Sequence, residues 1–347
     1  MTRRTALSLF LSGPAAGRRL EVRGMYSSPK AFWDKGARLS DWGVNALFVS
    51  AGSITAAMME RAAAEGARVF AEFATLNGKG YVDQHPEAWP VNERGEKAPA
   101  ATWFMGACPA DPEFRAWRMK QLDDLLDRHA VAGVWMDYFH WHAQFEDPNP
   151  VLPETCFSQS CVAAFEAASG IRVPKAPAAE RARAILGRHE REWRAWRARH
   201  LTGWARQVKA RLAEKRPGAL LGVYHCPWTD DEFAGARRRI LGLDLDELAG
   251  VVDVFSPMVY HGRMQRRPEW VGEYVEWLSR KIGGRAKIWP IVQAHNEPRP
   301  IPADEFETVL RLGSSGAASG VMMFTAQSVA SEDAKMQSMR RVYREAE

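Results

Sequence analysis

Eight short β-rich runs recur along the 347-residue sequence, and helical segments separate them. Several of the runs are apolar on both alternations, which is typical of strands buried on both faces of a parallel sheet. The first run lacks the glycine-rich phosphate turn that a doubly wound open sheet would normally carry. We therefore predict an α/β fold, a single (β/α)8 TIM barrel. The predicted strands cover 21–26, 44–50, 67–74, 132–139, 220–226, 251–260, 286–294 and 320–327.

The segments between the runs carry helix signals. Asp111 and Pro112 predict the start of a helix that ends near His129, and one long helix is predicted over 178–216 with a buried tryptophan stripe. Long excursions follow the third and fourth strands, at 75–110 and 140–177. In a barrel both emerge at the C-terminal face, so we expect them to form the walls of a pocket.

The domain organisation divides the chain into an N-terminal segment, 1–20, and one catalytic barrel, 21–347. Two arginines, a short apolar stretch and a small-residue tail give the first segment the features of a weak signal peptide. A disordered or strand-like start to a cytoplasmic protein is the alternative, so a periplasmic or secreted location and a cytoplasmic one both stay open. No apolar run approaches the roughly 18–20 residues that a membrane span requires.

The net charge of +5 comes mostly from arginines on the predicted helices, without a separate block of like charge. This distribution indicates a solvated helical face and no nucleic-acid partner. Four cysteines at this length do not define a disulfide framework, although Cys156 and Cys161 are close enough to pair or to share a metal. Two cysteines are few for a structural zinc site, so we expect neither a metal nor a cofactor.

Polar and aromatic residues gather where the predicted strands end. Sugars present C–H faces that stack on aromatic rings and hydroxyl groups that pair with acids, amides and imidazoles. We therefore expect a carbohydrate-binding site, in which Trp141 and Trp228 provide stacking surfaces. The expected binding residues are Tyr26, Tyr138, His140, Trp141, His142, His225, Trp228, Tyr260, His261, Gln293, His295 and Gln327.

Glycosidic cleavage needs two carboxyl groups, one to protonate the leaving oxygen and one to attack or to activate water. Asp137 ends the apolar fourth strand, and we predict that it is the nucleophile or the water-activating base. Glu72 leads as its acid partner, followed by Glu297 and Asp231. Glu72 has an alternative structural role, paired with an arginine such as Arg23, and Asp231 has one in capping the next helix.

Four motifs resemble a hypothetical family of (β/α)8-barrel glycoside hydrolases, over about residues 22–330. In that family the fourth strand reads DGVWLDY and a cysteine-containing insertion often reads C-x-C-x-x-C. This chain has Ala132 where the family often has Asp, and Ser158 in place of the middle cysteine. The resemblance implies hydrolysis of a glycosidic bond in an oligo- or polysaccharide. The motifs are CPADPEFRAW (108–117), VAGVWMDYFHW (131–141), CFSQSCVAAFEAASGI (156–171) and DVFSPMVYHGRMQRRPEWV (253–271).

Two other functions remain open. One is a metal-dependent hydrolase of amides or phosphoesters that uses His140, His142, His225 and an aspartate as ligands. The other is a barrel that binds glycans without turnover, which requires that Asp137 has no second carboxyl group within about 10 Å. The sequence leaves the sugar, the linkage, the stereochemical outcome and the oligomeric state undetermined.

Overall fold

A computed structural model describes residues 19–347, and it confirms the predicted barrel. Within this part of the chain the strands pair in parallel in the order β5-β4-β3-β2-β1-β9-β8-β6, and a further pairing of β5 with β6 closes the ring. The N-terminal segment predicted over 1–20 lies almost entirely outside the described residues. The strands are β1 (Val22–Tyr26), β2 (Ala46–Ser50), β3 (Arg68–Ala74), β4 (Gly133–Asp137), β5 (Leu220–His225), β6 (Val254–Val259), β7 (Lys287–Ile288), β8 (Ile291–Gln293) and β9 (Gly320–Phe324).

The seventh position of the barrel is divided between the two short strands β7 and β8, where the sequence predicts one continuous strand. Both pair with β6, and the interruption falls at Trp289 and Pro290. Proline has no backbone N–H to donate to a sheet, so it interrupts the ladder at this point. The barrel therefore contains eight strand positions built from nine strands.

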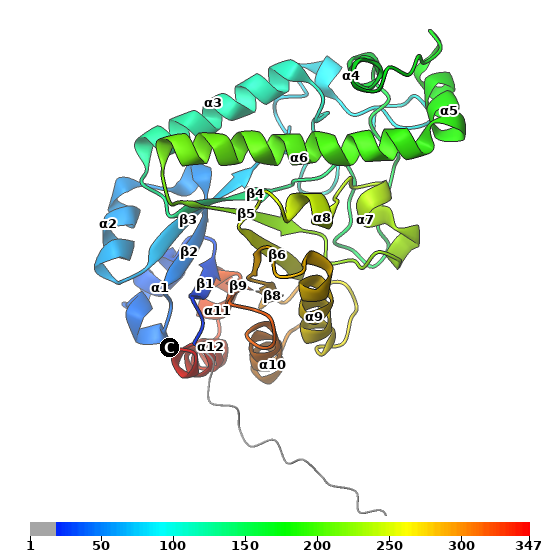
Figure 1. Cartoon of the computed structure of the whole chain (residues 1–347). Coiled ribbons are helices and arrows are strands. Elements are labelled where there is room, and N and C mark those ends of the chain that lie inside the picture. The colour runs from blue at the N-terminus through cyan, green and yellow to red at the C-terminus, as the bar shows by residue number, and fades with distance from the viewer. Residues whose placement is uncertain (1–18) are drawn as a thin grey trace, which may run out of the picture.

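The helices cover the outside of the barrel, and most of them connect successive strands. In Figure 1, α3 to α6 lie on one side of the barrel, and α10 and α12 lie on the opposite side. The α-helices are α1 (Lys30–Asp34), α2 (Ala56–Ala64), α3 (Pro112–Arg128), α4 (Gln159–Ser169), α5 (Ala178–Arg188), α6 (Glu190–Lys215), α7 (Ala236–Arg239), α8 (Leu245–Leu248), α9 (Trp270–Ile282), α10 (Ala303–Gly313), α11 (Ala326–Ala330) and α12 (Asp333–Glu345). The short 3-10 helices are η1 (Leu39–Trp42), η2 (Ala51–Ser53), η3 (Pro86–Ala88) and η4 (Glu232–Ala234).

The single helix predicted over 178–216 is wrong, because two helices, α5 and α6, occupy this segment. The chain leaves helical geometry at His189, with φ −132° and ψ 24°. This residue is neither proline nor glycine, so no sequence signal marks the break. The prediction that the tryptophans are core is confirmed, since Trp193, Trp196 and Trp204 are buried against α3, α4 and the excursion after β4.

An aromatic layer fills the interior of the barrel. Trp135 and Trp289 stack with ring centroids 5.3 Å apart, and Phe48 and Phe70 stack at 4.9 Å. Gly222 faces this layer, and a Cβ atom there would lie 2.1 Å from the Trp135 ring, so only glycine fits. Alternate residues of a strand share a face, which places the side chains two positions further along each strand above this layer, at the barrel mouth.

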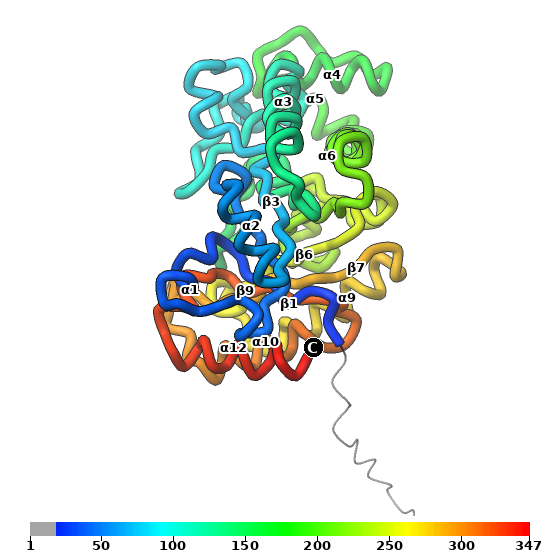
Figure 2. The backbone as a smooth tube through the Cα atoms, turned by 90° about the vertical axis from the view of Figure 1, so that its left-hand side faces the viewer, coloured from blue at the N-terminus to red at the C-terminus, as the bar shows by residue number. Residues whose placement is uncertain are grey.

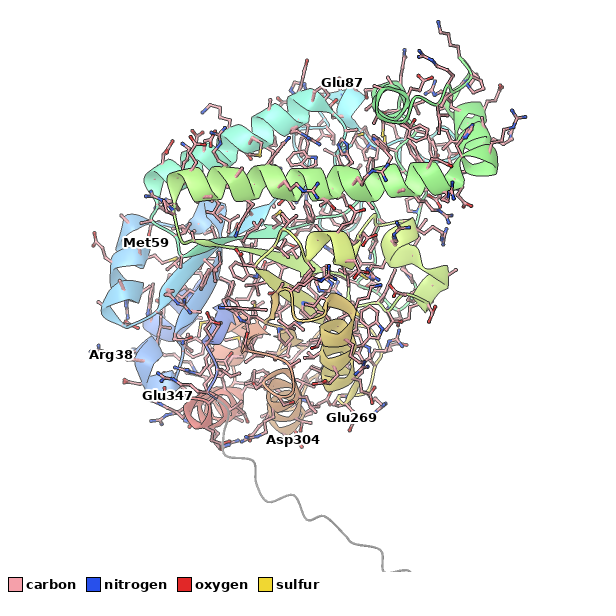
Figure 3. All side chains as sticks on the ribbon, in the orientation of Figure 1. Arg38, Met59, Glu87, Glu269, Asp304 and Glu347 are labelled. Atoms are coloured by element: carbon pink, nitrogen blue, oxygen red, sulfur yellow. The ribbon has the colours of Figure 1, made fainter. Side chains whose placement is uncertain are left out.

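The two long excursions after β3 and β4 lie together above the barrel mouth. Isolated β-bridges hold each excursion in place. Asn77 pairs with Gly106 within the first, Gln144 pairs with Val151 within the second, and Asn92 pairs with Thr155 between the two. Figure 2 shows that α3, α4 and α5 gather on one side of the barrel, and in Figure 3 Glu87 lies on that side, across the molecule from Asp304 and Glu347. None of the helices in the described residues is long and apolar enough to cross a membrane.

Candidate active site

A cavity of about 160 Å³ opens at the C-terminal ends of the barrel strands. Strands β1, β4, β5, β6 and β9 supply its floor, and the excursions after β3, β4 and β6 supply its walls. This position is where a (β/α)8 barrel builds its functional site, because the βα loops converge there. The lining residues are Tyr26, Trp103, Asp137, Tyr138, Glu146, Tyr224, Met258, Tyr260, Arg263 and Phe324.

Asp137 is the last residue of β4, two positions beyond Trp135 of the aromatic layer, so its carboxyl group faces the cavity. The backbone N–H of Tyr138 donates to its Oδ1 at 2.8 Å, across a turn in which Tyr138 has a left-handed φ of 50°. Burial raises the pKa of Asp137 well above its ordinary value, and the nearby carboxylate of Glu72 raises it further. The protonated form of Asp137 is therefore favoured.

Glu72 lies within β3 and is buried, with 6% of its surface exposed. Burial raises its pKa, while a hydrogen bond from Ser50 and the positive charge of Arg118 oppose the shift. Two buried carboxyl groups that repel each other cannot both ionise easily, so the pair holds a shared proton. Ser50 and Arg118 oppose the rise in the pKa of Glu72, whereas the pKa of Asp137 is raised well above its ordinary value despite the Tyr138 N–H, so the electrostatics favour the proton on Asp137.

The predicted pairing of Glu72 with Arg23 is wrong. The Arg23 guanidinium donates to the carbonyl oxygens of Gly43 and Leu20 and lies 3.8 Å from Glu347, near the opposite end of the barrel. Arg23 stands at the start of β1, whereas Glu72 stands near the end of β3. Parallel strands keep such positions apart along the barrel axis, so the cation that reaches Glu72 comes from α3 instead.

Glu146 is the second carboxyl group on the cavity, and it is not among the residues that the sequence predicts. It lies in the excursion after β4, and its side chain is 17% exposed. Burial raises its pKa to about 7, and neighbouring Asp147 adds to this shift. The Arg263 guanidinium opposes the shift, since its Nε lies 3.7 Å from Oε2 of Glu146. Loop residues carry no periodic signal, so the sequence pattern gave no reason to select Glu146.

Aromatic side chains form most of the remaining wall. Tyr26 packs edge-on against Tyr224 at 5.8 Å, and the rings of Tyr26 and Tyr260 each lie 4.9 Å from Phe324. Burial raises the pKa of each of these tyrosines, so their hydroxyl groups stay neutral and can donate hydrogen bonds. The structure thus brings Tyr26, Tyr138 and Tyr260 together with Asp137, as the sequence predicts.

The predicted stacking surfaces on Trp141 and Trp228 are wrong, because both rings are core. Trp141 is fully buried, its Nε1 donates to the Arg197 carbonyl at 3.2 Å, and its ring covers Gly242. Trp228 is 2% exposed and packs on Phe233. A stacking surface needs an accessible ring face. Trp103 lines the cavity, and the Arg263 guanidinium lies 4.6 Å from the centroid of its ring.

The three histidines of the metal-dependent alternative are engaged by the backbone. His142 uses both ring nitrogens, one with the Pro99 carbonyl at 2.7 Å and one accepting the Gly106 N–H at 3.1 Å. Nδ1 of His140 and of His225 contacts the carbonyl of the next residue at 2.8 and 3.0 Å. Within the described residues, the clusters of possible metal ligands contain none of these histidines. The geometry therefore does not favour the metal-dependent alternative.

The remaining predicted binding residues are not among those that line the cavity, and their surroundings differ. The Gln293 Oε1 accepts the Arg263 N–H at 2.9 Å, which fixes the loop that carries Arg263. His261 is buried and pairs with Glu305 at 2.6 Å. His295 packs edge-on against Tyr260 at 5.9 Å, and Gln327 is exposed on α11.

Glu297 and Asp231, the other predicted acid partners of Asp137, lie outside the cavity lining and are exposed. The Asp231 side chain also makes no capping hydrogen bond to η4, contrary to its structural alternative. Both residues stand in loops several positions beyond the strand ends, where the chain has already turned to solvent. The carboxyl groups that the structure brings together are Asp137, Glu72 and Glu146.

Comparisons with known proteins extend the description of the fold. No model of a protein family matches the sequence, and no curated protein matches it. Among solved structures, the glycoside hydrolase domain of PgaB (BpsB) from Bordetella bronchiseptica is similar, with a TM-score of 0.68 and 14% identity over 92% of this chain and 98% of that domain. A β-galactosidase from the Antarctic haloarchaeon Halorubrum lacusprofundi has a TM-score of 0.66 and 13% identity over 94% of this chain.

This chain spans 57% of that β-galactosidase. A variant of the glycoside hydrolase domain of PelA from Pseudomonas aeruginosa has a TM-score of 0.50 and 13% identity over 89% of this chain and 96% of that domain. At such identities the likeness establishes the (β/α)8 architecture. Unrelated reactions share this architecture, so function must be argued from the site itself.

Proposed function

We propose that this protein is a glycoside hydrolase that cleaves a glycosidic bond in an oligo- or polysaccharide with Asp137 and Glu146. The proposal rests on one observation above all: two carboxyl groups with raised pKa values line a single cavity at the barrel mouth. Such a pair is the chemical requirement for glycoside hydrolysis. The similar structures that are glycoside hydrolases, including PgaB and PelA, are consistent with it.

Electrostatics support a division of the two roles. Asp137 holds a proton because burial and the Glu72 charge raise its pKa, so it is the general acid that protonates the leaving oxygen. Glu146 ionises at about pH 7 beside Arg263, so it is the base or nucleophile. This assignment reverses the role that the sequence predicts for Asp137. The sequence locates the carboxyl group, but its protonation depends on Glu72, which only the fold brings close.

The cavity wall suits a sugar. Neutral tyrosine hydroxyl groups at Tyr26, Tyr224 and Tyr260 can pair with the ring hydroxyls, and Trp103 offers a face for the C–H side of a pyranose. The volume of about 160 Å³ is comparable to one sugar ring, so the rest of a longer substrate would extend over the open mouth. Both carboxyl groups would then lie next to the glycosidic bond at the end of that ring.

Aryl glycosides with good and poor leaving groups test the pair and its roles together. In Asp137→Asn, hydrolysis of phenyl glycosides falls by about 10²–10⁴-fold, whereas dinitrophenyl glycosides, which leave without protonation, are largely spared. In Glu146→Gln both substrates fail, and added azide restores turnover by replacing the carboxylate. The matched controls are Asp231→Asn and Glu297→Gln, which make the same changes in exposed loops and keep wild-type turnover.

The opposite rescue pattern, with azide restoring Asp137→Asn, would exchange the two roles and leave the pair intact. Retention of more than about a tenth of the activity in both variants would overturn the proposal, given the size of acid–base effects. Binding of oligosaccharides by the wild type without hydrolysis of any glycoside would favour the non-catalytic glycan-binding alternative.

A further inference from the structure

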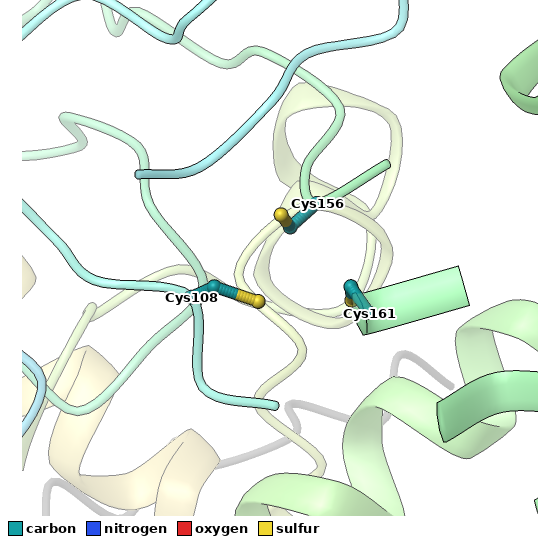
Figure 4. Close-up of side chains that lie close together, drawn as sticks. All are labelled: Cys108, Cys156 and Cys161. Carbon is teal, nitrogen blue, oxygen red and sulfur yellow. The ribbon is translucent and has the colours of Figure 1, made fainter. Parts of the chain in front are cut away.

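Three buried cysteines from separate parts of the sequence meet outside the active-site cavity. Cys108 precedes α3, Cys156 lies in the excursion after β4, and Cys161 lies in the first turn of α4 (Figure 4). Their sulfur atoms all lie within 4.8 Å of one another, and in the described residues each is a free thiol. The fourth cysteine of the chain, Cys226, is buried elsewhere and is not part of this cluster.

We propose that Cys108, Cys156 and Cys161 bind one structural zinc ion. Zinc–sulfur bonds of about 2.3 Å place the sulfurs of a tetrahedral site about 3.8 Å apart, so small side-chain movements bring the observed cluster to that geometry. Zinc prefers thiolate ligands in buried sites. The proposal replaces the expectation of no metal, which considered Cys156 and Cys161 without Cys108.

Ser158 contacts two of the three cysteines. Its Oγ lies 3.3 Å from Sγ of Cys156, and it accepts the Cys161 N–H at 3.3 Å while capping α4. Within the described residues no fourth cysteine, histidine or carboxylate joins the cluster, so we assign the fourth ligand to an oxygen, from the Ser158 hydroxyl or from water. The site is therefore a three-thiolate site with one weaker ligand.

Backbone donors and a buried cation surround the sulfur atoms. The Val91 N–H donates to Sγ of Cys156 at 3.4 Å, and the Ala110 N–H donates to Cys108. Three thiolates and Zn²⁺ carry one net negative charge, and the fully buried Arg197, whose charge acts on Cys156 and Cys161, compensates it. Such donors and counter-charges orient and stabilise the ligands of a metal site.

The proposed ion would join the two excursions that build the cavity walls. Cys108 belongs to the segment that carries Trp103, and Cys156 belongs to the segment that carries Glu146. Because the cluster is buried and separate from the cavity, the zinc would stabilise this wall rather than react with substrate. The inference does not depend on the proposed function, since it concerns metal binding by the folded chain.

Metal content and cobalt spectroscopy test the site in the full chain. Protein purified from zinc-supplemented culture is expected to contain one zinc per chain. After removal of zinc, Co²⁺ is expected to give thiolate-to-cobalt charge-transfer absorption and the visible bands of tetrahedral coordination. Cys161→Ser is expected to weaken zinc binding by at least about 10–100-fold, the size of a lost supporting contact. Cys226→Ser, which changes a buried cysteine outside the cluster, is the matched control and keeps wild-type binding.

If Cys161→Ser does not fold, Ser158→Cys provides a second test of the zinc site. A fourth thiolate is expected to bind zinc more tightly than the wild type and to intensify the charge-transfer absorption of cobalt. Folded wild-type protein that contains no zinc and shows no thiolate-to-cobalt band would overturn the proposal. A disulfide between two of the three cysteines, detected by mass after alkylation without reduction, would overturn it as well.

Discussion

The acidic residues at the two ends of the barrel have different surroundings. At the N-terminal end, Glu21 pairs with Lys287 at 2.7 Å, and Asp253 pairs with Lys209 and accepts the Leu221 N–H at 2.7 Å. At the mouth, burial raises the pKa values of Asp137, Glu72 and Glu146. Paired acids stabilise a fold, whereas acids whose ionised form is disfavoured are typical of functional sites.

The same substitution at the two ends gives the largest contrast. We expect Asp137→Asn to lower turnover of phenyl glycosides by about 10²–10⁴-fold without loss of stability, because Asp137 favours its neutral form and the isosteric amide keeps the oxygen that accepts the Tyr138 N–H. We expect Asp253→Asn to keep turnover and to lower the free energy of unfolding by about 1 kcal/mol, because it weakens a charged hydrogen bond. Denaturant unfolding and steady-state kinetics on both variants measure the two effects.

A clear loss of stability in Asp137→Asn would break the comparison, since it would mean that this carboxyl group holds the strand ends together. A loss of turnover in Asp253→Asn would also contradict the comparison, because it would mean that an acid at the N-terminal end of the barrel affects catalysis.

The pH profile of kcat/KM tests the pKa values proposed for the two carboxyl groups at the barrel mouth. Glu146 must be ionised, so the rate rises as the pH passes about 7, and it falls at higher pH as Asp137 loses its proton. Arg263→Gln removes a cation that lowers the pKa of Glu146, so the acidic limb moves to higher pH. Glu72→Gln removes a negative charge that raises the pKa of Asp137, so the basic limb moves to lower pH.

Arg263→Lys serves as the control, because it keeps the positive charge and is expected to keep the acidic limb in place. A purely structural role for either residue would lower the rate at every pH and leave both limbs where they are. That outcome would contradict the proposal that Arg263 and Glu72 shift the pKa values of Glu146 and Asp137.

The smallest effect is expected for the ion pair of Glu21 and Lys287, whose side chains are 36% and 44% exposed. Exposed ion pairs contribute about 0–1 kcal/mol, so Lys287→Met should change the free energy of unfolding by no more than this. Turnover should equal that of the wild type. A larger loss, measured by denaturant unfolding, would mean that the base of the barrel depends on this pair more than its exposure indicates.

Parts of the fold and of the site followed from local patterns. Alternation and apolar runs located all eight strand positions, and the same patterns placed Asp137, Tyr26 and Tyr260 at strand ends, where a barrel brings them together. The break between α5 and α6 escaped detection because His189 is not a helix-breaking residue. Aromatic type alone could not separate the buried Trp141 from Trp103 on the cavity, because burial depends on partners distant in sequence.

The sequence by itself determined the barrel and the position of Asp137, because the period of a strand and the place where it ends are local properties of the chain. Only the tertiary structure decided which acid shares the cavity with Asp137 and where its proton resides. Glu146 reaches the site through a loop, Arg263 comes from another, and Cys108 meets Cys156 from a distant segment. Coulomb interactions and ligand geometry depend on distances through space, and those distances exist only once the chain has folded.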